Sequence, residues 1–172
     1  MTSEPSPSVH ACAVKVGERA VLIRGPSGAG KSRLAFDLIL AGRAGQLPPT
    51  ILVGDDRVRL NTVGTELLVR VVPELAGLIE IFGLGIRRCD FVDEAIVALV
   101  VDLAADDAAR QPAPQALQIS LSGVLLPRIP VAAGHDPFHL VVGALTTTAS
   151  SSSVNLSAHC VGGIGNHINA TE

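Results

Sequence analysis

A chain of 172 residues has the size of one globular domain and is long enough to bury a hydrophobic core. Its net charge is −3, and it has no Lys/Arg cluster interleaved with aromatic residues, so we do not expect it to bind nucleic acid. The longest apolar run, residues 95–103, falls well short of the ~18 residues of a membrane span, and three widely spaced cysteines favour the reducing cytoplasm, so we expect a cytoplasmic protein without a membrane partner.

The first part of the chain predicts a hairpin followed by a helix. Residues 9–16 and 20–24 are apolar runs with strand character, and Gly17-Glu18 between them predicts a tight turn. We expect His10 to lie on the first of these two strands, level with the segment that follows the second. Residues 32–41 carry apolar side chains at helical spacing and end near Gly42, which predicts a helix.

The segment between the hairpin and the helix reads Gly25-Pro26-Ser27-Gly28-Ala29-Gly30-Lys31-Ser32. It fits G-x-x-x-x-G-K-[ST], a loop whose backbone N–H groups and following helix N-terminus cradle phosphates. In such a loop Lys31 reaches the β- and γ-phosphates, and the Ser32 hydroxyl holds Mg²⁺. The alternative is a glycine-rich strand-to-helix turn without a ligand. The strand–loop–helix context, in a chain with only two lysines, favours the nucleotide-binding interpretation.

Later segments predict more strands and a closing helix. A loop at 46–50 precedes a short buried strand at 51–53, which ends at Asp55-Asp56, and extended segments at 57–60 and 66–72 flank a turn at Gly64. Residues 73–78 predict a loop or short helical turn, and 80–86 predict an apolar strand interrupted by two glycines, a sign of a bend or a close backbone approach. A Val-rich central strand at 95–103, a polar connection at 106–114, a hairpin within 117–131 and a helix at 139–145 follow.

Together these elements predict an α/β fold, a single phosphate-loop kinase domain with a mixed sheet over residues 9–145. Residues 1–8 are polar and contain proline, so we expect a disordered N-terminus. Residues 146–172 are rich in Thr, Ser, Gly and Asn, which predicts a flexible tail.

Other polar residues indicate what is done with the nucleotide, which a phosphate loop alone does not. Asp55 and Asp56 follow a buried strand, 24 and 25 residues after Lys31. In that position one carboxylate can face Mg²⁺ and the phosphates, while the other accepts a proton from an incoming hydroxyl. His10, Glu80 and Arg110 complete the set of candidates.

The order of His10, G-x-S-G-x-G-K-S, the Asp55-Asp56 pair and Glu80-Ile81-Phe82-Gly83-Leu84-Gly85-Ile86 resembles the HPr kinase/phosphorylase family over roughly residues 9–145. More narrowly it resembles the short alphaproteobacterial form, which has the C-terminal catalytic domain only. The resemblance implies a phosphate-loop fold of the HPr kinase/phosphoenolpyruvate carboxykinase type. His10 precedes Lys31 by 21 residues, as in that family.

The resemblance implies a bifunctional enzyme that regulates the phosphotransferase system. Such an enzyme uses ATP and Mg²⁺ to phosphorylate a serine of the phosphocarrier HPr, or of its nitrogen-related counterpart, and removes the phosphate with inorganic phosphate, releasing pyrophosphate. A homo-oligomer, a hexamer, is implied as well. The implied roles are proton transfer by Asp56 with His10 beside it, charge neutralisation by Lys31 and Arg110, and metal binding by Ser32 and Glu80, with Asp55 beside them.

Two positions differ from the family pattern. Phe82 stands where the family has an arginine, so either Arg87 or Arg88 compensates, or that arginine supports the site from a distance. Arg110 is the candidate for the arginine that follows the Val-rich strand, the alternative being a solvated loop charge. A phosphate-loop small-molecule kinase remains a competing function, against which stands the lack of an arginine-rich lid. A non-catalytic ATP-sensing module is the other, and a pure sensor needs neither Asp56 nor His10.

Overall fold

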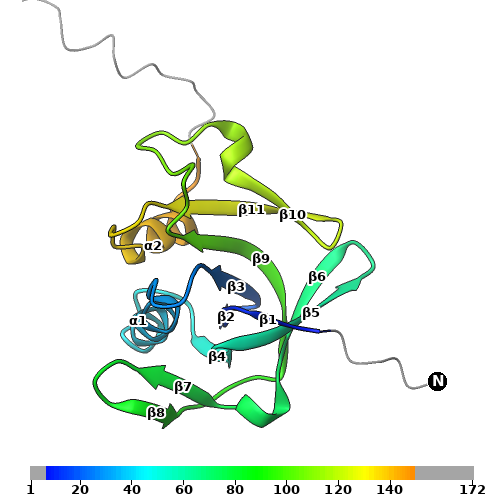
Figure 1. Ribbon diagram of the computed structural model, residues 1–172, viewed down its shortest axis with the longest axis vertical. Helices are drawn as coiled ribbons and strands as arrows, with labels where there is room; N and C mark the ends of the chain where they lie inside the picture. The colour runs from blue at the N-terminus through cyan, green and yellow to red at the C-terminus, as the bar shows by residue number, and fades with distance from the viewer. Residues whose placement is uncertain (1–6, 150–172) are drawn as a thin grey trace, which may run out of the picture.

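The computed structural model describes residues 7–149. Within these residues the chain forms one curled nine-stranded mixed sheet, a separate two-stranded hairpin, two α-helices and two short 3-10 helices (Figure 1). The strands of the large sheet are β1 (Ser8–His10), β2 (Cys12–Val16), β3 (Arg19–Arg24), β4 (Thr50–Gly54), β5 (Arg57–Val63), β6 (Glu66–Val71), β9 (Glu94–Leu103), β10 (Gln118–Leu121) and β11 (Val124–Val131). The hairpin consists of β7 (Leu78–Ile81) and β8 (Gly85–Arg88), and the helices are α1 (Lys31–Arg43), α2 (Phe138–Thr146), η1 (Pro73–Leu75) and η2 (Pro114–Leu117).

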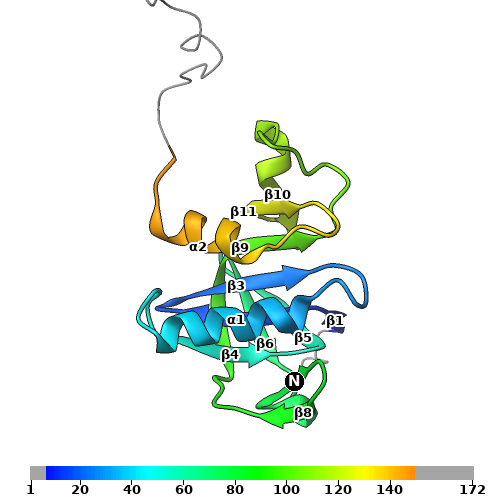
Figure 2. The same ribbon diagram turned by 90° about the vertical axis from the view of Figure 1, so that its left-hand side faces the viewer.

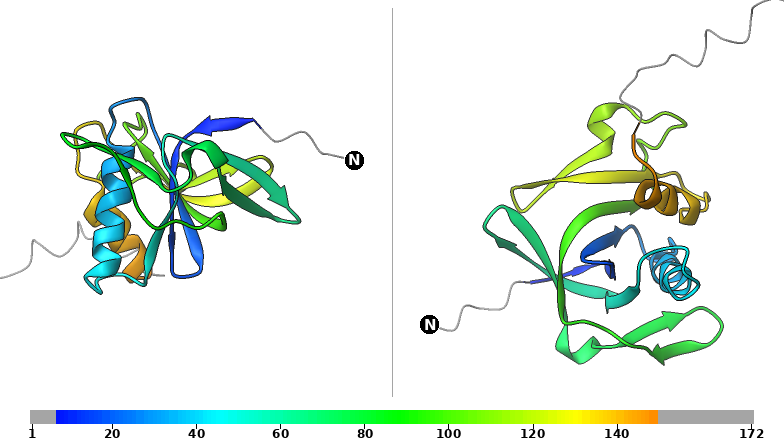
Figure 3. Two further views of the ribbon diagram at one scale, coloured as in Figure 1. Left: turned by 90° about the horizontal axis from the view of Figure 1, so that it is seen from below. Right: turned by 180° about the vertical axis from the view of Figure 1, so that it is seen from behind.

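The long strand β9 organises the sheet, whose order is β1-β5-β6-β9-β3-β2-β4, with β11 also paired to β9 and β10 paired to β11. β9 pairs antiparallel with β6 at its start and parallel with β3 and β11 further along. β9 therefore connects two groups of strands. The sheet as a whole is curled, as Figure 1 and the reverse view in Figure 3 show. The predicted α/β fold with a mixed sheet is confirmed.

Two hydrophobic cores lie on opposite faces of this sheet. Successive side chains of a strand point to opposite faces, so Val21 and Ile23 of β3 pack with α1, while Ala20 and Leu22 join the core enclosed by β5, β6, β9 and β11. Figure 2 shows α1 lying along β3 and β4, with α2 on the same side of the sheet. No helix in residues 7–149 is both long and apolar enough to cross a membrane.

Most local elements lie where the sequence places them. The β2–β3 hairpin, α1, the β10–β11 hairpin and α2 match the predicted segments within a few residues. β1 begins at Ser8 and α2 ends at Thr146, so these elements begin and end within one residue of the 9–145 range expected for the domain. Residues 1–6 and 150–172, which hold most of the two expected tails, lie outside the described residues.

Two strand predictions need correction. Residues 9–16 do not form one strand, because the strand is interrupted at Ala11. His10 belongs to β1, which pairs with β5, whereas β2 pairs with β3. Residues 80–86 are not one strand either, since the chain reverses between β7 and β8. Gly83 and Gly85 take φ values of 87° and 82°, which favour glycine, so the two glycines mark a turn.

Candidate active site

The glycine-rich loop connects β3 to α1 in an open conformation. Gly28 and Gly30 have φ values of 79° and 95°, and a Cβ added at either would meet no atom of residues 7–149 within 4 Å. Gly30 precedes the helix, where its carbonyl oxygen accepts the first helical hydrogen bond, from the N–H of Leu34 at 2.9 Å. The first-turn N–H groups of α1 have no carbonyl partner within the helix, so this end suits an anion.

The start of the loop is packed tightly against β9. A Cβ at Gly25 would lie 2.9 Å from the Cβ of Leu103 and 3.0 Å from the Leu103 carbonyl oxygen. Only glycine fits such an approach, and its φ of 148° is one that other residues rarely adopt. The end of β9 therefore fixes the entry of the loop.

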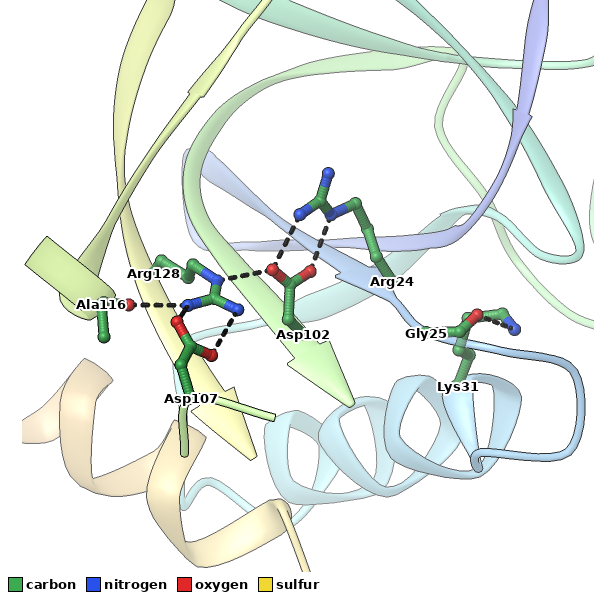
Figure 4. Close-up of polar contacts among 7 residues, drawn as sticks. All are labelled: Arg24, Gly25, Lys31, Asp102, Asp107, Ala116 and Arg128. Carbon is green, nitrogen blue, oxygen red and sulfur yellow. Dashed lines mark hydrogen bonds and ion pairs between the residues drawn. The ribbon is translucent and has the colours of Figure 1, made fainter. Parts of the chain in front are cut away.

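Lys31 places its ammonium group over the loop. The side chain is buried, and Nζ donates to the carbonyl oxygen of Gly25 at 2.9 Å (Figure 4) and to that of Pro26 at 3.0 Å. Two of the three ammonium donors are therefore used within the loop. This contact keeps a positive charge at the loop that would hold the phosphates.

Asp55 is the centre of the polar contacts around the loop. Its buried carboxylate accepts a hydrogen bond from Ser32 Oγ on Oδ1, at 2.8 Å, and one from the backbone N–H of Glu80 on Oδ2, at 2.9 Å. The Cys12 thiol also donates to Oδ1, at 2.6 Å. Burial and the neighbouring carboxylate raise the pKa of Cys12 well above its ordinary value, so the thiol remains a donor.

Asp56 and His10 meet at the edge of this cluster. Their side chains approach to 3.4 Å between Nε2 and Oδ1, and both are substantially exposed. Asp56 has a φ of 63°, an uncommon value for a residue with a side chain. Its carboxylate is therefore held at an accessible position beside the buried Asp55. The two residues come together although His10 lies on a different strand from the one expected.

The remaining candidates lie less centrally. Glu80 contacts Asp55 through its backbone, and its own side chain is exposed. Arg110 lies in the exposed loop between β9 and η2, and within residues 7–149 no hydrogen bond or ion pair joins it to the glycine-rich loop or the aspartates. Arg87 and Arg88, the residues that could replace the family's arginine at Phe82, lie on β8 and line a groove beside α1. In the same residues no three His, Cys, Asp or Glu side chains form a metal-binding group.

A second ionic cluster, absent from the sequence prediction, lies behind the loop. Asp102 of β9 accepts two hydrogen bonds from Arg24, each at 2.7 Å, and one from Arg128 of β11 at 2.6 Å (Figure 4). Arg128 also donates to both oxygens of Asp107 and to the Ala116 carbonyl. Burial alone would raise the pKa of Asp102, but the two guanidinium groups hold it below its ordinary value. The cluster joins β3, at the residue before Gly25, to β9 and β11.

Sequence signals for these missed residues did exist. Asp102 is a carboxylate within the apolar strand 95–103, and buried carboxylates are rare unless they are paired. Arg24 directly precedes the glycine-rich loop, at the end of a predicted strand that is otherwise apolar. Which residues pair could not be read locally, because Arg24 and Asp102 are 78 positions apart. Cys12 had no comparable signal, since a free cysteine commonly serves as a small hydrophobic residue.

The fold and the site together define a class of protein. It is a mixed α/β domain whose glycine-rich loop joins a central strand to a helix N-terminus, and a buried aspartate accepts a hydrogen bond from the serine at the start of that helix. Comparison with known proteins identifies the family. The pattern of the HPr Serine kinase C-terminal domain matches residues 3–156, and the chain belongs to this family.

Curated relatives and a solved structure agree with this assignment. A protein named HPr kinase/phosphorylase from Azoarcus sp. is 36% identical over 156 residues, which cover 82% of this chain and 47% of the relative. Another of that name from Mycoplasma mycoides is 36% identical over 106 residues, covering 58% of this chain and 32% of the relative. The structure of the Hpr(Ser) kinase/phosphatase from Coxiella burnetii shares the fold, with a TM-score of 0.63 and 24% identity over 80% of this chain and 92% of that one. The chain thus spans less than half the length of these two curated relatives.

Proposed function

We propose that this protein transfers phosphate from ATP to a serine of an HPr-type phosphocarrier and reverses the reaction with inorganic phosphate. The observation that carries the proposal is the buried Asp55, which accepts a hydrogen bond from Ser32 beside the exposed Asp56–His10 pair. One carboxylate is thereby directed at the loop that would hold the nucleotide, and the other remains accessible to a second substrate. A phosphotransferase needs both arrangements, whereas a nucleotide sensor needs only the first. Membership of the HPr serine kinase family supports the same conclusion.

The oxygen atoms around Asp55 fit a hard divalent cation. Ser32 Oγ and Asp55 Oδ1 lie 2.8 Å apart at the helix N-terminus, and the Glu80 carboxylate is carried by the residue whose N–H contacts Asp55. Hydroxyl and carboxylate oxygens of this kind bind Mg²⁺, which commonly keeps only one or two protein carboxylates and takes its other ligands from phosphates and water. We propose Ser32, Asp55 and Glu80 as its protein ligands. When bound, the ion would neutralise charge that develops on the phosphoryl oxygens.

Residues of the chain account for the proton and charge transfers. In the kinase direction Asp56 accepts the proton of the attacking serine hydroxyl as the oxygen–phosphorus bond forms. In the phosphorolytic direction it returns that proton to the leaving serine oxygen, as microscopic reversibility requires. His10, whose Nε2 lies 3.4 Å from Asp56 Oδ1, orients the Asp56 carboxylate. The loop amides and Lys31 hold the β- and γ-phosphates, and Arg110 would have to approach from its exposed loop to contribute its charge.

Partner, location and assembly follow from this proposal. The substrate is the HPr-type carrier or its nitrogen-related counterpart, and inorganic phosphate and pyrophosphate are the co-substrate and product of the reverse reaction. Since ATP is made available in the cytoplasm, we place the protein there. A homo-oligomer, by resemblance a hexamer, remains a prediction that sedimentation of the purified protein tests.

The substitution Asp56→Asn tests the proposed proton transfer. It keeps the size of the side chain and leaves the loop and Asp55 intact, so ATP affinity should stay within about twofold while transfer in both directions falls by a factor of about 10² to 10⁴. A matched control is Glu18→Gln, because Glu18 is an exposed carboxylate in the turn between β2 and β3. Unimpaired transfer by Asp56→Asn would remove Asp56 from the mechanism.

A further inference from the structure

The β7–β8 hairpin is a distinct part of the fold. Among the described residues its two strands pair only with each other, and they lie beyond α1 and β4, outside the nine-stranded sheet (Figure 1). Its turn is closed by a hydrogen bond from the N–H of Leu84 to the carbonyl oxygen of Ile81 at 2.9 Å. Gly83 and Gly85, both with positive φ, let the chain reverse within a few residues. The side chains at this turn are therefore not needed to fill the core of the domain.

The turn nevertheless carries large apolar side chains. Phe82 is fully exposed, and Leu84 and Ile86 are 67% and 71% exposed, so three such side chains fall within five residues. Single exposed apolar residues are common, but three of them within five residues of one hairpin indicate an interaction surface. Phe82 also occupies the position at which the sequence departs from the family pattern.

A groove of about 440 Å³ separates the hairpin from α1 and carries positive charge. Ile81 and Leu84 line its apolar side, and Arg43, Arg87 and Arg88 line it with one carboxylate, Asp90. Three guanidinium groups against one carboxylate give this face a positive excess, in a chain whose net charge is −3. The complementary surface is an apolar patch bordered by acidic side chains.

The hairpin is also coupled to the candidate active site. The backbone N–H of Glu80 donates to Asp55 Oδ2 at 2.9 Å, and Asp55 in turn accepts from Ser32. Phe82 follows Glu80 by two residues, which is about 7 Å along a strand. A protein seated on Phe82 and the groove would therefore lie directly beside the aspartates.

We propose that the hairpin and its groove form the docking surface for the protein substrate. Apolar side chains next to the phosphorylated serine contact Phe82 and Leu84, and acidic side chains of the same partner face Arg43, Arg87 and Arg88. This inference rests on the proposed function, because it takes the partner to be the protein that receives the phosphate. Phe82 then determines which carrier is recognised, while phosphate chemistry stays with the loop and the aspartates.

The test measures binding separately from transfer. The HPr-type carrier, labelled with a fluorophore, is titrated with the full-length protein, and its dissociation constant is read from fluorescence anisotropy. Phe82→Ser and Arg43→Ser should each weaken carrier binding about tenfold, a cost of roughly 1.4 kcal/mol, and raise the KM for the carrier to match. ATP affinity and kcat at saturating carrier should remain within about twofold.

Matched controls remove the same kinds of side chain elsewhere. Leu125→Ser removes a 65% exposed apolar residue from β11, and Arg19→Ser removes a half-exposed arginine from the start of β3. Both should leave carrier binding unchanged. Because Phe82 is fully exposed, Phe82→Ser should also keep the melting temperature of the parent protein.

The possible outcomes distinguish the docking surface from the proposed activity. Carrier binding equal to that of the parent protein in both Phe82→Ser and Arg43→Ser overturns the docking surface and leaves the kinase function standing. A change in oligomer size in Phe82→Ser, with carrier binding unaltered, also overturns it and assigns the hairpin to contacts between copies. Carrier binding that depends on Phe82 without any phosphate transfer supports docking and refutes the proposed activity. Absence of both binding and transfer in the parent protein refutes both claims.

Discussion

The substitution Asp102→Asn probes the ionic cluster behind the glycine-rich loop. Asp102 accepts three hydrogen bonds from two guanidinium groups, and an asparagine can keep at most two of them while directing its own N–H group at a donor. Removing one partner of a buried ion pair costs about 3 to 5 kcal/mol. Arg24 keeps some exposure and Arg128 keeps Asp107, so both cations retain other interactions. We therefore expect a loss of about 2 to 3 kcal/mol in the free energy of unfolding.

Urea unfolding followed by circular dichroism measures this loss. With a slope of about 2 to 3 kcal/mol/M, the midpoint should fall by about 1 M at unchanged slope. The control is Glu66→Gln, because its hydrogen bond with Arg19 is equally short, at 2.6 Å, but both side chains are half exposed. That exposed pair should contribute less than about 1 kcal/mol. Equal losses in the two variants would show that burial does not determine the strength of the pair.

Two further predictions concern acid stability and the loop entry. Because the pKa of Asp102 is lowered in the folded protein, its contribution is fully present above the unfolded pKa of about 3.9 and is lost as the pH falls through the lower folded value. The stability gap between the parent protein and Asp102→Asn should thus be constant from about pH 5 to 7 and shrink toward pH 3; a gap that persists undiminished at pH 3 contradicts this. Gly25→Ala should lower the free energy of unfolding by about 1 to 3 kcal/mol, because its Cβ would lie 2.9 Å from the Cβ of Leu103. The loss should exceed that of Gly28→Ala, whose Cβ would meet open space. Calorimetry that ranks the two variants in the opposite order would show that the Leu103 contact is unimportant.

Local patterns were sufficient to predict much of the fold. Turn residues such as Gly17 and Gly64, alternation within strands and the helical spacing after Lys31 depend on neighbours in sequence, and the structure has elements at these places. Predictions that depended on distant pairing were less accurate. The sequence predicts His10 beside β3, but the interruption at Ala11 places it on the separate strand β1. There it pairs with Arg57 of β5, 47 residues away in sequence. Residues 80–86 predict one strand because their apolar residues are nearly continuous in sequence, but Phe82, Leu84 and Ile86 are exposed side chains of a hairpin.

The candidate site divides in the same way. The glycine-rich loop and the two aspartates follow a spacing that is fixed within one strand–loop–helix unit and the strand after it, so they could be found from sequence. Glu80 is a candidate from the sequence, but its metal-binding role is implied only by the family resemblance, and the structure brings its backbone N–H to Asp55. Asp102, Arg24 and Arg128 meet because β3 and β11 both pair with β9, and strand order is not encoded in any local pattern. Arg110 remains a prediction, in an exposed loop.

Phosphorylation of the purified HPr-type carrier with Mg-ATP, followed by addition of excess inorganic phosphate, tests the proposed transfer and its reversal together. We expect incorporation of one phosphate on a serine of the carrier, and its removal with release of pyrophosphate once inorganic phosphate is in excess. Lys31→Ala should abolish both steps, because it removes the ammonium group that lies over the glycine-rich loop. Tight ATP binding without transfer to the carrier would contradict the account and assign the protein to the ATP-sensing class.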